Sequence, residues 1–388
     1  MKTFEQLNIE KSILDVIKEE GFDKPTEIQE KTIPLAIEGR DILAGSATGS
    51  GKTLAFGAGI IQNTQKGGGI QALILTPTRE LAQQVKDSLK KFSKNKKLII
   101  TSVYGGMPIR GQFKRLEEAD IVVGTPGRIL DHINRRTIRL KEVRTLVLDE
   151  ADRMLDMGFI DDVEKIMKNL PKDKQTLLFS ATIHGMVAHM IEKFLNNPVK
   201  IEVESNVDPA KLKQGYYDVQ DNLKYSLLVN LLKKEESGLV MVFCNTRHNT
   251  DFIANNLSGN GIDAEAIHGG FTQKKRNRIL EKFHTQKVLT LVCTDVAARG
   301  LDIQDVSHIY NYDVPTDPKD YIHRIGRTAR AGKKGEAITI LSSRDHDNFR
   351  RVAQANQISI PKLDTPQIDR VNLTWKAKPT KFRKKRRR

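Results

Sequence analysis

The chain has 388 residues, more than one hydrophobic core normally accommodates, so we expect two domains of ordinary size. Hydrophobic residues make up 38% of it and charged residues 29%, and no apolar run approaches the roughly twenty residues of a membrane span. Residues 1–5 do not resemble a secretory signal, so we expect a cytoplasmic protein, and its net charge of +16 predicts a polyanionic partner.

Short runs rich in Val, Ile and Leu alternate with helical patterns through the first half of the chain. Nearly continuous apolar residues over a few positions are typical of strands buried on both faces of a parallel sheet. Residues 80–92 and 161–170 instead carry apolar side chains three or four positions apart, as helices do. This alternation predicts a doubly wound α/β domain. The expected strands are residues 41–44, 72–76, 98–103, 120–123, 145–148 and 176–180.

A second series of strand-like runs follows in the other half of the chain, with a helix expected at 251–257. Cys244 and Cys293 lie in or beside these runs, and we interpret them as buried small hydrophobic residues rather than as a disulfide. Polar turn residues around position 206 mark the joint between the halves. The second-half strands are expected at 239–243, 288–292, 309–312 and 337–341. The predicted organisation is a first domain at 1–204, a linker at 205–212, a second domain at 213–365 and a tail at 366–388.

A glycine-rich segment follows the first expected strand and precedes a helical pattern. Backbone N–H groups of such a loop converge on phosphate oxygens at the helix N-terminus, so the segment predicts a nucleotide site. Lys52 is expected to reach the β- and γ-phosphates, and Thr53 to place its hydroxyl on Mg²⁺. The other expected contacts are Ser46, Ala47, Thr48, Gly49, Ser50 and Gly51, although the general pattern has Gly in place of Ser46.

Carboxylates at the end of another buried strand are expected to complete the nucleotide site. Asp149 is predicted to hold Mg²⁺, directly or through water. Glu150 is predicted to orient and deprotonate the water that attacks the γ-phosphate. For Asp152 alone, an acidic residue that caps the following helix is the alternative interpretation.

Three blocks together carry a resemblance to a known family: the glycine-rich segment, Asp-Glu-Ala-Asp at 149–152 and Ser-Ala-Thr at 180–182. With them, the chain resembles the helicase core of the DEAD-box ATP-dependent RNA helicases over most of its length. The resemblance implies two RecA-like domains, with ATP and RNA bound across their cleft. It also implies that Asp152, Ser180 and Thr182 couple hydrolysis to unwinding.

Residues 21–29 resemble the Q motif of that family. A glutamine amide both donates to and accepts from the N6/N7 edge of adenine, so Gln29 predicts recognition of ATP. Phe4 and Phe22 are expected to stack or pack around the base, and Thr26 belongs to the same block. Taken singly, one Gln and two Phe are more often ordinary surface and core residues.

Arginines follow one another at intervals of three in the second domain. Arg324, Arg327 and Arg330 therefore share one face if the segment is helical. By resemblance, Arg327 and Arg330 are arginine fingers that bring positive charge to the γ-phosphate, and His323 and Arg324 act in coupling. A solvated basic stripe is the alternative.

Two further positions of the second domain follow from the resemblance. Asp295 matches the residue that relatives place on the ribose of ATP. Ala329 stands where the family usually has Gly, and we expect its methyl group to be tolerated with at most a slight effect on closure.

Glycines, hydroxyls and arginines follow several expected strands in both domains. Glycines at strand ends let backbone amides approach phosphates, and arginines add charge, but taken singly these are turn residues. Together they resemble the RNA-contacting blocks of the family. The resemblance assigns RNA contacts to Pro77, Thr78, Arg79, Gly105, Gly106, Thr125, Pro126, Gly127 and Arg128 in the first domain, and to Thr246, Gly270, Gln273, Arg276 and Thr294 in the second.

The tail is the most basic part of the chain, because nine of its last thirteen residues are Lys or Arg. We expect it to be disordered and to add RNA affinity. A merely solubilising tail is the alternative, and charge alone does not separate RNA from DNA or from an acidic membrane surface.

The blocks together predict an enzyme with ATP and Mg²⁺ as cofactors. None of the assigned RNA contacts is equipped to read base edges, so we expect recognition of the RNA backbone and 2′-OH with little sequence preference. We predict an RNA-stimulated ATPase that separates short RNA duplexes or remodels RNA–protein complexes, acts as a monomer and does not bind membranes. The alternatives are an RNA chaperone or ATP-locked clamp, and a DNA helicase on the same scaffold.

Overall fold

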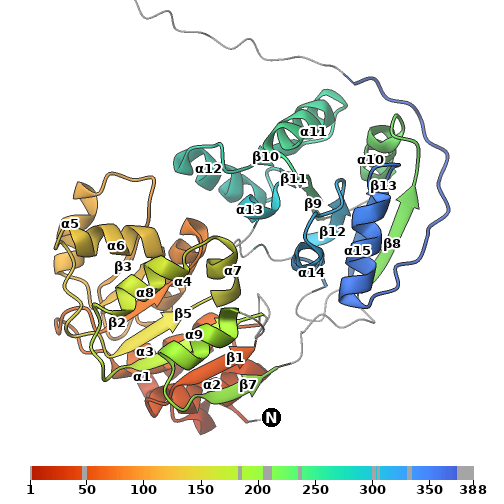
Figure 1. Ribbon diagram of the computed structural model, residues 1–388. Coiled ribbons are helices and arrows are strands. Elements are labelled where there is room, and N and C mark those ends of the chain that lie inside the picture. Colours follow the sequence, from red (N-terminus) through yellow and green to blue (C-terminus); the bar gives the residue numbers. More distant parts are fainter. Residues whose placement is uncertain are drawn as a thin grey trace, which may run out of the picture. The chain divides into compact units, whose positions relative to one another are not determined.

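The computed structural model describes residues 2–45, 50–181, 186–203, 212–234, 238–298, 303, 306–329 and 334–373. It contains two compact units, each with one all-parallel sheet (Figure 1), which confirms the predicted fold class of tandem α/β domains. The first unit holds the elements from η1 to β7, and the second those from β8 to α15. Among the described residues, no helix combines the length and apolar character that crossing a membrane requires.

The sheet of the first unit has seven strands in the order β3-β4-β2-β5-β6-β1-β7. All six predicted strands are present, and an edge strand, β7, was not predicted. Its sequence alternates between buried and exposed positions, because an edge strand is covered less completely than a central one. The strands are β1 (Ile42–Gly45), β2 (Ala72–Leu75), β3 (Ile100–Val103), β4 (Ile121–Gly124), β5 (Thr145–Leu148), β6 (Gln175–Ser180) and β7 (Val199–Glu202).

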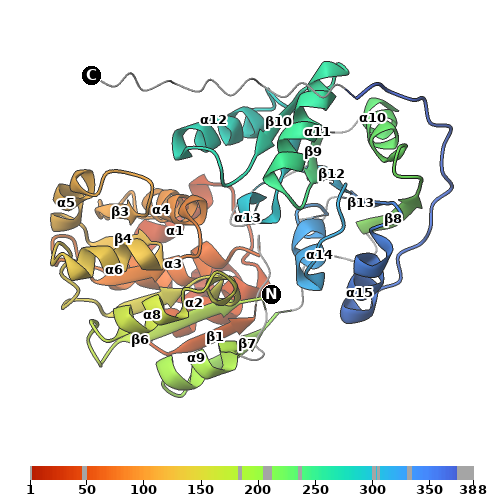
Figure 2. The same ribbon diagram turned by 45° about the horizontal axis from the view of Figure 1, so that its top comes forward.

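Helices cover both faces of this sheet, as Figure 2 shows. Successive side chains of a strand point to opposite faces, so each central strand contributes to two cores. On β6, Leu177 and Phe179 pack with η1 and α1 to α4, whereas Leu178 packs with α5 to α9. These helical elements are η1 (Phe4–Leu7), α1 (Lys11–Glu19), α2 (Glu27–Ile37), α3 (Lys52–Asn63), α4 (Arg79–Phe92), α5 (Arg110–Glu117), α6 (Pro126–Asn134), α7 (Ala151–Asp156), α8 (Ile160–Met167) and α9 (Met186–Phe194).

The sheet of the second unit has the strand order β10-β11-β9-β12-β13-β8. Both strands that the sequence patterns missed, β8 and β10, lie at its edges, where continuous apolar runs are not required. Cys244 and Cys293 are buried and free, as expected. The strands are β8 (Leu212–Asp218), β9 (Leu239–Phe243), β10 (Ala264–Ile267), β11 (Thr290–Cys293), β12 (Val306–Asn311) and β13 (Gly335–Leu341).

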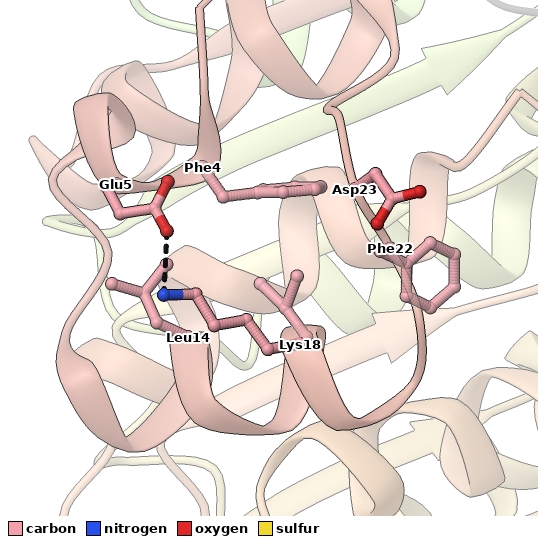
Figure 3. Close-up of a pocket in the computed structure, with 7 residues that line it drawn as sticks. Phe4, Glu5, Leu14, Lys18, Phe22 and Asp23 are labelled. Carbon is pink, nitrogen blue, oxygen red and sulfur yellow. Dashed lines mark ion pairs between the residues drawn. The ribbon is translucent and has the colours of Figure 1, made fainter.

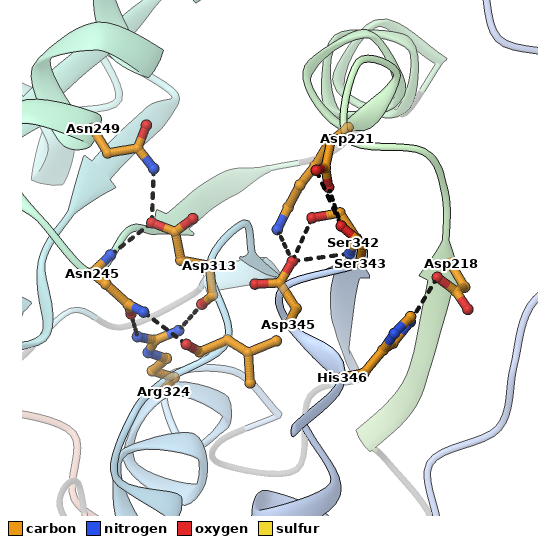
Figure 4. A network of polar contacts seen from close by, with 12 residues as sticks. Asp218, Asp221, Asn245, Asn249, Asp313, Arg324, Ser342, Ser343, Asp345 and His346 are labelled. Carbon is orange, nitrogen blue, oxygen red and sulfur yellow. Dashed lines mark hydrogen bonds and ion pairs between the residues drawn. The ribbon is translucent and has the colours of Figure 1, made fainter. Parts of the chain in front are cut away.

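Helices of the second unit pack on its sheet, and the apolar residues of α10 and α11 contribute to one core with side chains of β9, β11, β12 and β13. A buried ion pair between Lys224 and Asp345 joins the start of α10 to the segment after β13, where the Ser342 backbone N–H donates to the same carboxylate at 2.9 Å (Figure 4). The helices are α10 (Lys224–Lys234), α11 (Arg247–Gly259), α12 (Gln273–His284), α13 (Asp295–Ala298), α14 (Pro318–Ile325) and α15 (His346–Asn356).

The chain after α15 runs along β8, as the blue segment of Figure 1 shows. There the Leu363 N–H donates to the Tyr216 carbonyl at 2.8 Å, and the Tyr216 N–H donates to the Pro361 carbonyl at 3.0 Å. It then reaches α10, where the Asn230 amide donates to the Asp369 carbonyl at 2.9 Å and accepts from its N–H at 3.2 Å. The expectation of disorder from residue 366 onward therefore does not hold for residues 366–373, because backbone groups there have specific partners. The basic residues 376–388 lie outside the described part of the chain.

Candidate nucleotide and RNA sites

Nearly all the predicted site residues of the first unit follow the carboxyl ends of its strands, and the strand order divides them into two groups. The glycine-rich segment, Asp149 and Ser180 follow or end β1, β5 and β6, which are neighbours in the sheet. The predicted RNA blocks follow β2, β3 and β4, which are also neighbours. Since parallel strands end at one edge of the sheet, the topology places the residues predicted to bind nucleotide and those predicted to bind RNA in two neighbouring groups along that edge.

The glycine-rich segment is described from Ser50 onward; Ser46, Ala47, Thr48 and Gly49 lie outside the described residues. Gly51 precedes the first residue of α3 with a φ of 90°, a conformation that L side chains rarely adopt. A Cβ at this position would also lie 2.4 Å from the Gln29 amide nitrogen. Lys52 begins α3 and is buried, and Thr53 follows it.

The Q-motif residues contact the glycine-rich segment directly. The Gln29 amide nitrogen donates to the Gly51 carbonyl at 3.1 Å, and its amide oxygen accepts from the Thr26 N–H at 2.9 Å. The Thr26 hydroxyl donates to the Ser50 carbonyl at 2.9 Å. Thr26 and Gln29 therefore hold the backbone that leads into α3, a role that the sequence did not predict for them.

Phe4 and Phe22, expected around the adenine, line one pocket of about 230 Å³ in the first unit (Figure 3). The Phe4 ring is buried, whereas Phe22 is 44% exposed. An ion pair of 2.9 Å between Lys18 and Glu5 forms part of the lining. Gln29 is not among the lining residues of this pocket.

Asp149 is the first residue after β5, and its carboxylate is nearly fully buried. Its Oδ1 lies 3.7 Å from the Lys52 ammonium and has no hydrogen-bond partner in the described structure. Burial raises the pKa of Asp149 to about 6, and the Lys52 charge opposes that rise. A buried carboxylate oxygen without a partner suits a hard cation such as Mg²⁺.

Mg²⁺ is usually held by one or two carboxylates together with nucleotide phosphates and water. The described residues contain no group of three or more His, Cys, Asp or Glu that would bind a metal without such additional ligands. Asp149, with Thr53 at the start of α3, therefore fits a cation that enters with a nucleotide, rather than a preformed protein cage.

Glu150 adopts a left-handed backbone conformation, with φ of 56° and ψ of 51°, although it is not a glycine. Such strained residues persist only where the surrounding structure holds them, and they cluster at functional sites. The Glu150 carboxylate is buried and pairs with Arg153 at 2.9 Å. The sequence interpretation missed Arg153, although its position three residues after Glu150 at the start of a helix was an available signal.

Asp152 joins the segments that follow two neighbouring strands. Its carboxylate accepts a hydrogen bond of 3.2 Å from the Ala181 N–H, one residue after buried Ser180. The Asp-Glu-Ala-Asp and Ser-Ala-Thr blocks are therefore in direct contact through this bond. Thr182, the last residue of the second block, lies outside the described residues.

The structure brings Arg79 together with the glycine pair that follows β3. Thr78 caps α4 by accepting from the Leu81 N–H at 3.2 Å, and Arg79 is the first helical residue. Gly106 has a φ of 83°, and a Cβ there would lie 2.1 Å from an Arg79 guanidinium nitrogen. Gly105 also lies beside that guanidinium, where an added Cβ would be 3.3 Å from one of its nitrogens, so Gly106 is the more constrained of the two glycines.

The other RNA blocks of the first unit flank this group. Thr125 immediately precedes α6, whose first residue is Pro126, and Gly127 is its second. The Arg128 guanidinium donates to the Met107 carbonyl at 3.1 Å, which joins this block to the segment after Gly106. Pro77 is buried between β2 and α4.

The predicted RNA residues of the second unit also follow three neighbouring strands, β10, β11 and β9. Thr246 follows β9 and caps α11, and Gly270 follows β10. Thr294 follows β11, and its carbonyl accepts from two N–H groups of α13. On α12, Gln273 is the first residue and Arg276 donates to the Ala297 carbonyl at 3.4 Å.

Arg324 is fully buried, contrary to the picture of a solvated basic stripe. Its guanidinium makes hydrogen bonds of 2.6 and 2.7 Å to the two carboxylate oxygens of Asp295. It also donates to Asn245 at 3.0 Å and to the Asp313 carbonyl at 2.6 Å (Figure 4). Arg324 therefore ties together the segments after β9, β11 and β12, and Asp295, expected on the ribose, is its main partner.

The expected helical face of three arginines is interrupted. Gly326 caps the C-terminus of α14, so the helix ends at Ile325, before Arg327. Arg327 is buried in the following turn, and Arg330 lies outside the described residues. His323, on α14, has a ring nitrogen 3.8 Å from the Asp320 carboxylate.

Ala329 has a φ of 55° and is buried. The left-handed region is where glycine is favoured, which explains why a glycine is usual at this position. The chain therefore carries a strained alanine two residues after Arg327.

Comparison with known proteins agrees with this arrangement. Residues 26–191 match the model of the DEAD/DEAH box helicase family, and residues 223–332 match the helicase conserved C-terminal domain. The ATP-dependent RNA helicase CshA of Listeria monocytogenes is 46% identical over 372 residues, which are 95% of this chain and 72% of that protein. The DEAD-box ATP-dependent RNA helicase CshA of Bacillus subtilis is 43% identical over 95% of this chain and 75% of its own length.

Solved structures give the same result. The structure of S. cerevisiae Dbp5 bound to RNA and ADP BeF3 matches with a TM-score of 0.86 and 32% identity, over 94% of this chain and 96% of that one. A DEAD box protein from Methanococcus jannaschii is 44% identical, with a TM-score of 0.57 over 93% of this chain and 99% of its own. The chain therefore belongs to the DEAD-box family of ATP-dependent RNA helicases.

Proposed function

We propose that this chain couples RNA-stimulated ATP hydrolysis to the local separation of short RNA duplexes, without sequence preference. The observation that carries the proposal is the buried Asp149 carboxylate, which lies 3.7 Å from Lys52 and has an oxygen without a hydrogen-bond partner in the described structure. A buried carboxylate oxygen without a hydrogen-bond partner is costly unless a cation or a hydrogen-bond donor of a ligand reaches it.

In this proposal the charged and polar side chains of the nucleotide site have separate tasks. Lys52 binds the β- and γ-phosphates, and Thr53 and Asp149 hold Mg²⁺, which neutralises charge on the phosphates when bound. Glu150 orients the attacking water and accepts its proton, and its pairing with Arg153 holds the carboxylate in place. Arg327 and Arg330 supply positive charge to the transferred phosphoryl group.

Adenine recognition is proposed for Phe4, Phe22 and Gln29. The hydrogen bond from Gln29 to Gly51 links the residue expected to read the base with the loop expected to hold the phosphates. Binding of the base is therefore expected to affect the phosphate loop through this contact. Asp295 is proposed to contact the ribose in addition to holding Arg324.

RNA is proposed to bind through its backbone. The residues that follow β2, β3 and β4, and those that follow β9, β10 and β11, are mainly glycines, threonines and arginines. Such groups contact phosphates and sugars and carry no base information, which supports shape and 2′-OH recognition. We further propose that the basic residues 376–388 add affinity and that the protein acts as a monomer.

Glu150→Gln tests the catalytic assignment. The variant should bind ATP with unchanged affinity, while RNA-stimulated turnover falls by about 10²-fold or more, because an amide does not accept the proton. Glu38→Gln is a matched control, since Glu38 is exposed and lies at the opposite end of β1. Turnover of E150Q at the level of the control would remove Glu150 from this role.

Duplex separation with ATP and with a non-hydrolysable analogue tests the coupling. A helicase that uses hydrolysis for repeated cycles should separate a short RNA duplex many times with ATP and at most once per protein with the analogue. Equal multiple-turnover release in both conditions would favour an RNA chaperone over a helicase. Deoxyribonucleotide strands provide the comparison for RNA preference.

A further inference from the structure

The first unit holds a buried glutamine whose side-chain amide joins three separate parts of the chain. Gln112, on α5, is 7% exposed. Its amide nitrogen donates to the Tyr104 carbonyl at 3.2 Å, and its amide oxygen lies 3.0 Å from the Nε2 atom of His132 on α6. The same oxygen accepts from the Arg128 guanidinium at 3.5 Å. One side chain thus connects α5, α6 and the segment that follows β3.

The partners fix the orientation of the Gln112 amide. The Tyr104 carbonyl can only accept a hydrogen bond and the Arg128 guanidinium can only donate one, so the amide nitrogen must face the first and the oxygen the second. His132 Nε2 therefore carries a proton and donates to the same oxygen. A glutamate at this position would lack the donor, and a methionine would lack both the donor and the acceptor.

His132 anchors this amide from the interior of the unit. Its ring is fully buried, and its other nitrogen, Nδ1, accepts from the Thr137 hydroxyl at 2.8 Å when Nε2 holds the proton. Burial lowers the pKa of His132, and the Arg128 charge lowers it further, so the ring is neutral at pH 7. Phe113 packs edge-on against the ring, with 5.9 Å between the ring centroids. The imidazole is therefore held in one orientation and one tautomer.

The network holds the carbonyls on both sides of the Gly105–Gly106 pair. The carbonyl of Tyr104, just before the pair, accepts from Gln112. The carbonyl of Met107, just after the pair, accepts from Arg128 at 3.1 Å. Because Arg128 also donates to Gln112, the two ends of the glycine segment are tied to each other through one amide group.

The guanidinium of Arg79 depends on the position of the same glycine segment. A Cβ added to Gly106 would lie 2.1 Å from one of its nitrogens, so the segment and the guanidinium fit together without spare room. Arg79 and Arg128 are the two cations proposed to contact RNA in the first unit. Their placement relative to each other therefore depends on a segment that Gln112 holds.

We infer that Gln112, backed by His132, is a positioning residue for RNA binding, which fixes the Gly105–Gly106 segment and the Arg128 guanidinium relative to each other. Both side chains are buried, so they act through the backbone and Arg128 rather than by touching RNA. The inference rests on the proposed function, because it concerns the RNA contacts proposed for the first unit. A preorganised site loses less conformational entropy on binding, so its disruption weakens RNA affinity without changing the nucleotide site.

Gln112→Met and Gln112→Glu test the role of the amide. Q112M keeps the approximate volume and loses every hydrogen bond of the amide, whereas Q112E keeps acceptor oxygens and loses the donor to Tyr104. RNA-stimulated ATPase assays measure the KM for RNA, the KM for ATP and kcat. Both variants should raise the KM for RNA about fivefold, roughly the net value of one hydrogen bond, while kcat at saturating RNA and the KM for ATP stay unchanged. A wild-type KM for RNA in Q112E would overturn the role of the Tyr104 bond, and the inference with it.

Gln175→Met is the matched control. Gln175 is the first residue of β6, at the opposite end of the strands from the RNA blocks, and it too donates to backbone carbonyls, those of Ala36 at 3.1 Å and Arg40 at 2.8 Å. Q175M should lower the melting temperature as Q112M does, yet keep the wild-type KM for RNA. An equal rise of that KM in both variants would mean that general destabilisation, rather than positioning, is the cause.

Two substitutions at His132 test the anchor. The amide nitrogen of His132→Gln extends to about the Nε2 position and can donate to Gln112, whereas the shorter amide of His132→Asn reaches the Nδ1 position and cannot. H132N should therefore have a higher KM for RNA than H132Q. Equal values in the two variants would remove His132 from the network.

Arg128→Ala separates the inference from the function on which it rests. If R128A raises the KM for RNA and neither Gln112 variant does, Gln112 is not a positioning residue, while the proposed RNA contacts stand. If RNA does not stimulate the ATPase of the wild-type chain, the proposed function is wrong and the inference falls with it.

Discussion

The guanidinium of buried Arg324 is held by both carboxylate oxygens of Asp295, at 2.6 and 2.7 Å. This pair connects α14 to the segment after β11 inside the second unit. A residue expected to contact the ribose is therefore also the main anchor of a buried cation. The two roles make different predictions for the same substitution.

Asp295→Ala should destabilise the second unit. Removing one partner of a buried ion pair leaves the other charge uncompensated, which costs about 3 kcal/mol of the free energy of unfolding. Asp347→Ala, which removes the partner of exposed Arg350, should cost less than about 1 kcal/mol. Urea unfolding of the full chain measures both. A higher KM for ATP without loss of stability would assign Asp295 to the ribose alone.

Gly51→Ala should abolish tight ATP binding. The substitution combines a left-handed φ of 90° with a contact of 2.4 Å to the Gln29 amide nitrogen, so the loop that leads into α3 must move. Gly39→Ala is the control, because Gly39 has a φ of 78° but nothing within 4 Å of an added Cβ. Both variants should lose about 1 kcal/mol of stability, and only G51A should lose ATP affinity by calorimetric titration. Equal ATP affinities would show that the contact is unimportant.

Ala329→Gly should not destabilise the protein, unlike most alanine-to-glycine changes. Replacing an alanine in the left-handed conformation by glycine removes backbone strain and stabilises the folded protein by about 1–2 kcal/mol. This gain exceeds the roughly 0.4–1 kcal/mol by which glycine stabilises the unfolded chain. Ala353→Gly, in the middle of α15, should instead cost about 1 kcal/mol. Comparing the two unfolding free energies checks the prediction, and similar losses at both positions would contradict it.

Two substitutions at His268 separate its two hydrogen bonds. His268→Asn places an amide near the Nδ1 position and can still accept from Gly270, whereas His268→Gln extends toward Asp251 and loses the Gly270 bond. If the turn at Gly270 must be fixed for RNA binding, H268N should retain RNA affinity and H268Q should lose it several-fold, by about the net value of one hydrogen bond. Fluorescence anisotropy titration with a labelled single-stranded oligoribonucleotide measures the RNA affinity of both variants. An equal loss in the two variants would mean that the Asp251 bond, or the ring itself, matters instead.

Truncation after Leu373 should weaken RNA binding without destabilising the fold, because it removes the basic residues 376–388 but keeps the contacts of Asp369 with Asn230. The slope of log affinity against log salt should become shallower, since fewer counterions are released. Truncation at residue 365 should lower the melting temperature as well. An unchanged salt slope after truncation at Leu373 would show that residues 376–388 do not contribute to RNA binding.

Most strands of the two units were predictable from residue patterns. Central strands of a parallel sheet are buried on both faces, so apolar runs such as residues 145–148 and 239–243 can be recognised as strands from their composition alone. The edge strands β7, β8 and β10 could not be recognised in this way, because partial exposure permits polar residues among the apolar ones. The order of residues also predicted where a nucleotide would bind, since phosphate loops and their carboxylates occupy fixed places between strands and helices.

Sequence by itself determined the two α/β units and their family, and it predicted a chemistry for each block, because these depend on local patterns and residue types. Only the tertiary structure decided which side chains are already committed to partners. It pairs Arg324 with Asp295, joins Gln29 to Gly51 by a hydrogen bond, and places Arg79 beside Gly105 and Gly106. Such contacts join residues far apart in the chain, and their formation depends on the register and crossing of neighbouring strands, which no local pattern encodes.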